Sequence, residues 1–253
     1  MKSFLNSNKP IITGMLTEKT VEATVEKIGA YKSQGVEAFC FQLEQLVKED
    51  KTPERLAIIF DAMGELPSYV TNYMRSNSEK DSISWETLEE QLLLAVSLGA
   101  TLIDVPTDMY HPSDMEFTTD PDAIARQKAF IEKLHSLGAE VLMSAHVLRF
   151  VEADTVMTIA KAQIERGADI AKIVTWADSD EQLYHNFEIS LSLRKSGIKN
   201  LFLCGGECRR MHRLLGPLFG SSIYLVRESG AEMREVQPAI DLALEAINYL
   251  PES

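Results

Sequence analysis

The sequence has 253 residues, of which 25 are Lys or Arg and 38 are Asp or Glu, so its formal net charge is −13. This negative charge repels phosphate backbones and anionic lipid surfaces, and the longest basic run is Arg209-Arg210, so we expect no nucleic-acid or membrane partner. Three cysteines do not make a disulfide framework, and neither a secretory leader nor an apolar stretch of about twenty residues is visible. We therefore predict a reduced, cytoplasmic protein.

Short apolar runs alternate with longer segments of helical period eight times along the chain. Most of the predicted helices end in a glycine just before the next strand, as at Gly35 and Gly99, which is the usual left-handed stop after a last helical turn. The predicted strands span residues 10–16, 36–43, 68–74, 101–106, 140–146, 169–177, 200–205 and 222–226. The predicted helices span residues 18–34, 52–63, 85–98, 121–137, 153–166, 181–196, 209–215 and 236–249.

The strands are continuous apolar runs, which is typical of parallel strands that are covered on both faces. Eight strand–helix units without a linker predict one α/β domain over residues 1–253, a single (β/α)8 TIM barrel. A doubly wound open sheet is the alternative. Its glycine fingerprint is missing after the first strand, where the chain reads Thr13-Gly14-Met15-Leu16-Thr17, and this favours the barrel.

Catalytic residues of such barrels lie at the carboxyl ends of the strands, and Lys172 interrupts the sixth strand with a charge. Burial lowers the pKa of a lysine, and a neutral amine in a dry pocket can form a Schiff base with a carbonyl substrate. The structural alternative is a lysine paired with a carboxylate.

Other polar residues are predicted at the same end of the barrel. His146 closes the fifth strand and can move protons near neutral pH, although it can also be a structural histidine. Arg75 and Glu79 follow the third strand; the arginine can hold a carboxylate and the glutamate can orient the histidine, while a solvated surface pair is the alternative.

The segment from Cys204 to Arg213 follows the seventh strand and begins with the paired glycines Gly205 and Gly206. Paired glycines before a short helix allow backbone N–H groups to approach an anion, which makes this segment a weak phosphate-site candidate. Cys204 and Cys208 do not have zinc-finger spacing, and we interpret them as small apolar residues. We predict no metal site.

In their order and spacing, these residues resemble the type I 3-dehydroquinate dehydratases, (β/α)8 enzymes of the shikimate pathway and of quinate use. The resemblance covers the whole chain. Ser144-Ala145-His146 is similar to the family's Ser-x-His, residues 167–173 are similar to its Schiff-base lysine strand, and residues 213–221 are similar to the segment of its carboxylate-binding arginine. Met74-Arg75 followed by Glu79 is similar to the family's Arg and Glu after the third strand.

The resemblance implies that Lys172 forms an imine with a substrate ketone and that His146 removes the neighbouring proton and later protonates the departing hydroxyl. Glu79 would position His146, and Arg213, helped by Arg75, would hold the ring carboxylate. The reaction would need no metal and no organic cofactor. Because the family commonly dimerises, a homodimer that acts on a small cyclic keto acid is expected.

The chain departs from the family where the substrate is recognised. In the second strand, Cys40-Phe41-Gln42-Leu43-Glu44 stands where the family has Glu-x-Arg-x-Asp, so one acid and one arginine are replaced. In the eighth loop, residues 232–237 stand where the family has Ser-Ala-Pro-Gly-Gln, with Gln237 shifted by one position from the family's glutamine. We therefore expect Gln42 and Gln237 to contact a substrate with altered hydroxyl or ring substituents.

Two other functions remain open. One is a class I aldolase-type carbon–carbon lyase, which would have a second carboxylate or lysine beside Lys172; Asp104 and Asp178 are the nearest candidates in the sequence. The other is a non-catalytic ligand-binding descendant of the family.

Overall fold

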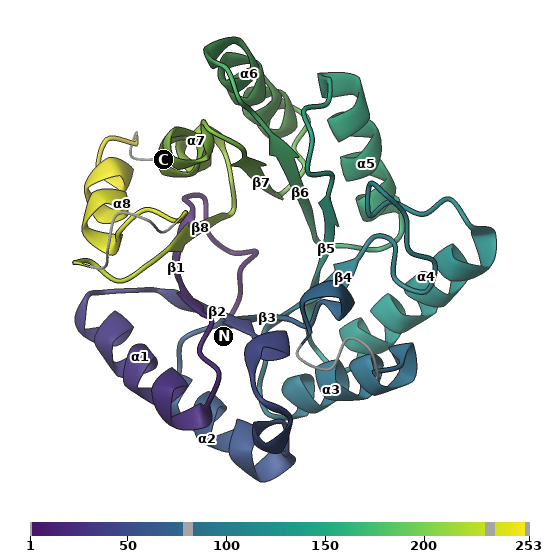
Figure 1. The fold of residues 1–253 in the computed structure, drawn as a ribbon, viewed down its shortest axis with the longest axis vertical. Coiled ribbons are helices and arrows are strands. Elements are labelled where there is room, and N and C mark those ends of the chain that lie inside the picture. Colours follow the sequence, from purple (N-terminus) through teal and green to yellow (C-terminus); the bar gives the residue numbers. More distant parts are fainter. Residues whose placement is uncertain (1, 78–82, 231–235, 251–253) are drawn as a thin grey trace.

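Eight parallel strands form the centre of the molecule and helices surround them (Figure 1). The computed structural model describes residues 2–77, 83–230 and 236–250. The strands follow one another around the ring in the order β7-β6-β5-β4-β3-β2-β1-β8, and between β8 and β7 the Ser222 N–H donates to the Asn200 carbonyl at 2.7 Å. The predicted (β/α)8 barrel is therefore confirmed. Its strands are β1 (Ile11–Leu16), β2 (Ala38–Gln42), β3 (Ser68–Thr71), β4 (Leu102–Pro106), β5 (Glu140–His146), β6 (Ile170–Trp176), β7 (Asn200–Gly205) and β8 (Ile223–Val226).

Local sequence signals set the limits of most helices. The Thr20 and Ser84 side chains accept N–H groups of the first turns of α1 and α3, and Gly35 and Gly167 take φ values of 89° and 111° after α1 and α5. No helix among the described residues is long and apolar enough to cross a membrane. The helices are α1 (Val21–Ser33), α2 (Pro53–Met63), α3 (Trp85–Ser97), α4 (Pro121–Ser136), α5 (Ala153–Glu165), α6 (Asp180–Lys195), α7 (Arg209–Leu215) and α8 (Ile240–Ile247), with the short 3-10 helices η1 (Leu43–Gln45), η2 (Lys48–Asp50), η3 (Met74–Ser76) and η4 (Gly216–Phe219).

Several predicted elements are too long by a few residues, and two of these differences have a visible cause. The third strand ends at Thr71 and not at residue 74, because the Asn72 side chain turns away to donate to Gln91 of α3. The last helix begins at Ile240 and not at residue 236, because the segment before it runs extended and the Pro238 carbonyl accepts the Arg227 N–H after β8. A proline at that point also disfavours helical backbone in the residue before it.

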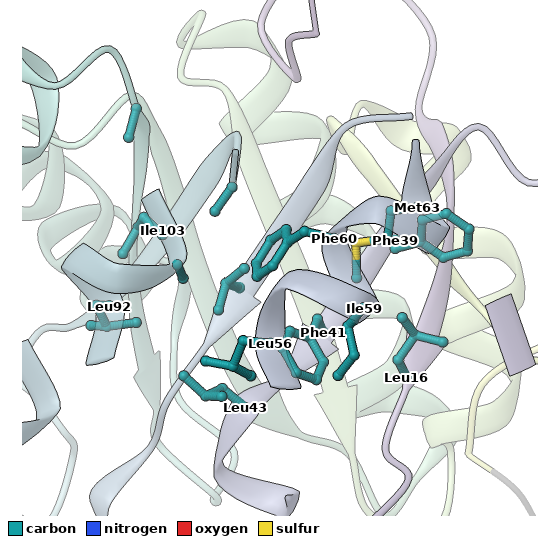
Figure 2. Close-up of a cluster of buried hydrophobic side chains, with 14 of the residues drawn as sticks. Leu16, Phe39, Phe41, Leu43, Leu56, Ile59, Phe60, Met63, Leu92 and Ile103 are labelled. Atoms are coloured by element: carbon teal, nitrogen blue, oxygen red, sulfur yellow. The ribbon is translucent and has the colours of Figure 1, made fainter. Parts of the chain in front are cut away.

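Side chains alternate between two apolar layers along each strand. On β2, Phe39 and Phe41 point outward and pack against α2, whose buried Leu56, Ile59, Phe60 and Met63 recur at helical spacing (Figure 2). Ala38 and Cys40 belong to the inner cluster that fills the barrel. Both faces of the strand are therefore buried, which explains why the strands lack alternating polarity in the sequence.

The barrel interior is apolar at its amino end and polar at its carboxyl end. Phe4, from the segment before β1, packs with Leu102 and Ile223 in the inner cluster and is 1% exposed. Further along β6, Ala171 and Ile173 face the outer helices, while Ile170 lies in the inner cluster. The same alternation turns the side chain of residue 172 toward the barrel axis, so the strand itself positions a lysine at the polar end.

Candidate functional site

Lys172 lies at the centre of a buried polar cluster inside the barrel. Its side chain is 5% exposed, and its Nζ donates to the Tyr69 hydroxyl at 2.9 Å and to the Tyr73 hydroxyl at 2.5 Å. The Asp104 carboxylate lies 3.2 Å from the same nitrogen. The alternative expected from the sequence, a lysine paired with a carboxylate, is thus correct in one respect, because Lys172 does have a carboxylate partner. Lys172 also lines a cavity, so its pairing with Asp104 does not prevent contact with a ligand there.

Asp104 is the acceptor that holds this cluster together. It is 1% exposed, and its Oδ2 accepts from both tyrosine hydroxyls while its Oδ1 accepts from the Ser144 hydroxyl at 2.5 Å. Burial and the Asp104 charge raise the pKa of Tyr69 and of Tyr73 well above the ordinary value, so both phenols stay protonated and act as donors. The carboxylate therefore has several donors, as a buried charge requires.

His146 faces the same cavity from the end of β5 and has an acidic partner of its own. Its Nδ1 lies 2.6 Å from Glu116 Oε2, and its main-chain N–H donates to the same oxygen at 2.9 Å. The Arg75 guanidinium forms an ion pair with the other oxygen of Glu116. Burial, together with the positive charges of Lys172 and Arg75, holds the pKa of His146 well below its ordinary value, so the ring is neutral at pH 7. A neutral imidazole can act as a base.

The cavity at the carboxyl ends of the strands has a volume of about 500 Å³. Arg213, on α7, lines it and donates from Nε to the Cys204 carbonyl at 3.0 Å. Burial lowers the pKa of Arg213 to about 10, which leaves the guanidinium charged, and no described carboxylate pairs with it. A charged, half-buried guanidinium without an acidic partner favours a carboxylate ligand. Lys172, His146 and Arg213 therefore meet at one cavity.

The glycine pair between β7 and α7 serves the packing of Trp176 rather than an anion. A Cβ on Gly205 would lie 2.5 Å from the Trp176 ring, and Gly206 takes a φ of 80° against the Ala177 carbonyl. The N–H groups that follow are already used, since Glu207 donates to Asp178 and the next N–H donates to Ala177. The predicted phosphate site is therefore wrong, because its donors are occupied within the protein.

The residues that replace the family's second-strand and eighth-loop motifs occupy different depths. Gln42 and Gln237 line the cavity, and the Gln237 amide oxygen is buried without a hydrogen-bond partner among the described residues. Glu44 does not line the cavity; it is 1% exposed and accepts the Thr71 hydroxyl at 2.9 Å. Burial raises the pKa of Glu44 to about 7. Cys40 adds a buried thiol to the cavity wall, and burial raises its pKa well above the ordinary value.

Of the other predicted site residues, the structure describes Arg75 but not Glu79. Arg75 lines a smaller neighbouring cavity of about 140 Å³, where it pairs with Glu116. Glu79 lies outside the described residues, so its role stays a prediction. Within residues 2–77, 83–230 and 236–250, no three His, Cys, Asp or Glu side chains are arranged to hold a metal ion.

Tyr69, Tyr73 and Glu116 belong to the site but were not predicted from the sequence. The two tyrosines had a usable signal, because they recur at a spacing of two with Thr71 between them, as residues on one face of a strand do. Glu116 had a weaker signal. It belongs to the long segment between β4 and α4, and long segments of this kind often carry function.

Comparison with known proteins gives one family match. A family model described as type I 3-dehydroquinase matches residues 12–248. No curated protein matches the chain in sequence.

Several solved structures share the fold at low identity. A type I 3-dehydroquinate dehydratase from Clostridium difficile, with covalently modified comenic acid, has a TM-score of 0.80 at 14% identity and covers 98% of this chain and 96% of its own. The enzyme from Geobacillus kaustophilus has a TM-score of 0.79 at 15% identity, with 98% and 95% covered. The enzyme from Enterococcus faecalis has a TM-score of 0.77 at 12% identity, with 100% of both chains covered. At these identities the likeness shows the fold.

Asp104→Asn is expected to lower the free energy of unfolding by about 3 kcal/mol, because it leaves the buried Lys172 ammonium without its negative partner. Asp61→Asn is the matched control, because Asp61 is exposed on α2 and its substitution should change stability by less than about 0.5 kcal/mol. Urea unfolding of the three proteins at pH 7 measures the difference. Equal stability of the two variants would contradict the role given to Asp104.

The raised pKa of Glu44 predicts that the free energies of unfolding of the protein and of its Glu44→Gln variant differ by an amount that depends on pH. The folded-state pKa of Glu44, about 7, lies above the ordinary value of 4.5, so the folded protein binds this proton more tightly than the unfolded chain does. Glu44 therefore destabilises the fold as pH rises from about 4.5 through 7. Relative to the natural protein, Glu44→Gln should gain stability over this range, whereas Glu165→Gln, at an exposed position, should not.

Proposed function

Because the chain belongs to the type I 3-dehydroquinase family, we propose that it is a Schiff-base carbon–oxygen lyase. Its substrate is 3-dehydroquinate or a close cyclic keto-acid relative, and its product is the dehydrated enone. The main observation that supports this proposal is that three residues from β6, β5 and α7 line the same cavity: Lys172, His146 and Arg213. They supply a nucleophile, a base and a carboxylate-binding cation, which together are what this reaction needs.

The reaction begins at the Lys172 amine. The ammonium gives up a proton, and the neutral Nζ adds to the substrate ketone to form a carbinolamine. The carbinolamine hydroxyl takes up that proton and leaves as water, which gives a protonated imine. His146, neutral before reaction, takes the proton from the neighbouring carbon, and the electron pair moves into the iminium to form an enamine. The enamine then expels the β-hydroxyl, to which the His146 imidazolium returns its proton, and hydrolysis of the imine releases the enone and the lysine.

The remaining cavity residues bind and orient. Arg213 holds the ring carboxylate by charge-assisted hydrogen bonds. Gln42 and Gln237 contact substrate hydroxyls, which is supported by the unpartnered amide oxygen of Gln237. The predicted help of Arg75 in carboxylate binding is less well supported, because Arg75 is paired with Glu116.

The cavity wall supports a substrate that differs from 3-dehydroquinate in its hydroxyl or ring substituents. Cys40 and Gln42 stand where the family's pattern has an acid and an arginine, and Met15, Leu203 and Leu225 also line the cavity. Replacing an arginine by an amide removes a charge-assisted hydrogen bond, worth about 1.5–3 kcal/mol. A less polar ring therefore fits this wall better than a heavily hydroxylated one.

An aldolase-type carbon–carbon lyase is the second candidate, and the contact between Asp104 and Lys172 favours it, since that reaction was expected to place a second carboxylate beside the lysine. The position of Asp104 weighs against it. Both carboxylate oxygens are occupied by Tyr69, Tyr73, Ser144 and Lys172, and Asp104 does not line the cavity. A buried and fully hydrogen-bonded carboxylate supports the lysine but does not reach a substrate proton.

Borohydride trapping in the presence of 3-dehydroquinate tests the proposal. We expect a covalent adduct on the peptide that contains Lys172, seen by mass spectrometry, and enone formation in an ultraviolet assay. Lys172→Arg keeps a positive charge beside Asp104 but has no nucleophilic amine, so it should show neither signal.

The other outcomes separate the alternatives. An adduct without enone would support Schiff-base chemistry on another ketone, which a panel of cyclic keto acids would then identify. Carbon–carbon cleavage products would favour the aldolase-type lyase. If no ketone in the panel gives an adduct, the lyase proposal is wrong and the ligand-binding descendant is favoured.

We further propose that the protein acts as a homodimer in the cytoplasm, in shikimate or quinate metabolism. The free thiols of Cys40, Cys204 and Cys208 suit a reducing compartment. Among the described residues, eleven large apolar side chains are exposed, and six of them lie in or beside α7 and α8. Such a concentration is typical of an interaction surface. These side chains are Met211, Leu215, Val236, Leu242, Leu244 and Tyr249.

Sedimentation analysis should give twice the 28.3 kDa mass of one chain. Leu242→Lys should shift the protein toward the monomer, because it places a charge in this apolar surface. A monomer at all concentrations would contradict the dimer.

A further inference from the structure

We propose that Glu116, in the segment between β4 and α4, is the residue that positions His146 for proton transfer. The inference rests on the proposed lyase function for the role of His146, but the contact itself is independent of the substrate. It gives the partner of the histidine to a different segment from the one that follows β3, where the family resemblance places it.

The contact fixes the ring in one orientation. Glu116 Oε2 accepts the main-chain N–H of His146 at 2.9 Å and lies 2.6 Å from Nδ1 of the same residue. A carboxylate only accepts, so Nδ1 carries the ring proton and Nε2 is left as the basic nitrogen. The Tyr73 ring packs edge-on to the imidazole with the ring centres 5.1 Å apart, which limits rotation from another side.

The segment that carries Glu116 is anchored by buried polar groups. Arg166 is 5% exposed and donates to the Thr107 carbonyl at 2.8 Å and to the Thr118 carbonyl at 2.6 Å, so it joins the two ends of the segment. Gln127 donates to the Thr107 carbonyl at 3.1 Å. A buried arginine whose hydrogen bonds go to loop carbonyls holds that loop in one conformation.

Glu116 itself has a backbone conformation that glutamate rarely adopts, with a φ of 49°. A non-glycine residue in the left-handed region costs stability, and such residues persist where the surrounding structure determines them, often at functional sites. Its side chain is 14% exposed, and each carboxylate oxygen has a partner. Oε2 contacts His146, and Oε1 pairs with Arg75.

Arg75 contributes a positive charge beside the contact between His146 and Glu116. The groups that face His146 are the cations Lys172, Arg75 and Arg213, the carboxylate of Glu116 and the neutral phenol of Tyr73. Removing the Glu116 carboxylate and removing the Arg75 guanidinium should therefore shift the pKa of His146 in opposite directions. A merely structural role of the ion pair would not give opposite signs.

The experiment combines kinetics with histidine NMR on the full-length protein. Glu116→Gln keeps an acceptor but loses the charge, and we expect kcat to fall about tenfold; Glu116→Ala loses both, and we expect about a hundredfold, within the range that a positioned base contributes. KM should stay within about twofold, because Glu116 does not line the main cavity. Glu132→Gln, at an exposed position on α4, is the matched control and should keep the natural kcat.

NMR of ¹⁵N-labelled histidine reads the ring without substrate, with His146→Asn identifying its signal among five histidines. The natural protein should show the Nδ1–H form, Glu116→Ala should show a mixture of ring forms, and Arg75→Gln should raise the pKa of His146. If the Glu116 variants leave the ring unchanged while Glu79→Gln alters it, the proposal is overturned. If the ring responds as expected but no ketone is turned over, the lyase function fails and the positioning contact stands.

Discussion

The charge pair of Lys172 and Asp104 is the constraint around which the polar end of the barrel is organised. An ammonium group inside a ring of apolar strands needs a negative partner, and a buried carboxylate needs more than one donor. Tyr69, Tyr73 and Ser144 supply those donors from β3, the residues after it and β5. The cluster therefore connects neighbouring strands, and it fixes the Lys172 amine at the wall of the cavity. The cost of burying two charges is offset only while all of these partners remain in place.

The histidine depends on a second, separate arrangement. Its partner comes from a segment outside the barrel wall, and that segment is held by Arg166 through carbonyl groups at both of its ends. The proposed nucleophile, Lys172, is thus positioned by strands, whereas the proposed base, His146, is positioned by a strand end and a loop. The two halves of the proposed chemistry can change independently in sequence, because they share few supporting residues.

Much of the fold could be predicted from the sequence because its signals are local. The apolar runs, the capping residues and the glycines after the helices each act within a few residues, and they place eight strand–helix units correctly. Lys172 and His146 were predictable together because strand ends meet at one end of a barrel, whereas the role of Arg213 was predicted from the family resemblance. The partners were not. Asp104 was one of two candidates for a carboxylate beside Lys172, and the sequence did not distinguish it from Asp178. Glu116 lies in a segment without periodicity, so only the folded chain brings it to His146.

The ring also constrains the order in which the protein can form. β1 completes its pairing with β8, as Ile11 lies opposite Ile223, whereas β2 to β7 pair only with strands next to them in sequence. On the ribosome, the first strand must therefore wait with one edge unpaired until nearly the whole chain has been made. Such an edge is open to pairing with other chains, and contacts between distant parts of a sequence form slowly. Synthesis of this barrel thus has a vulnerable interval that ends only when the last strand arrives, and a chaperone that shields the β1 edge would act at that stage.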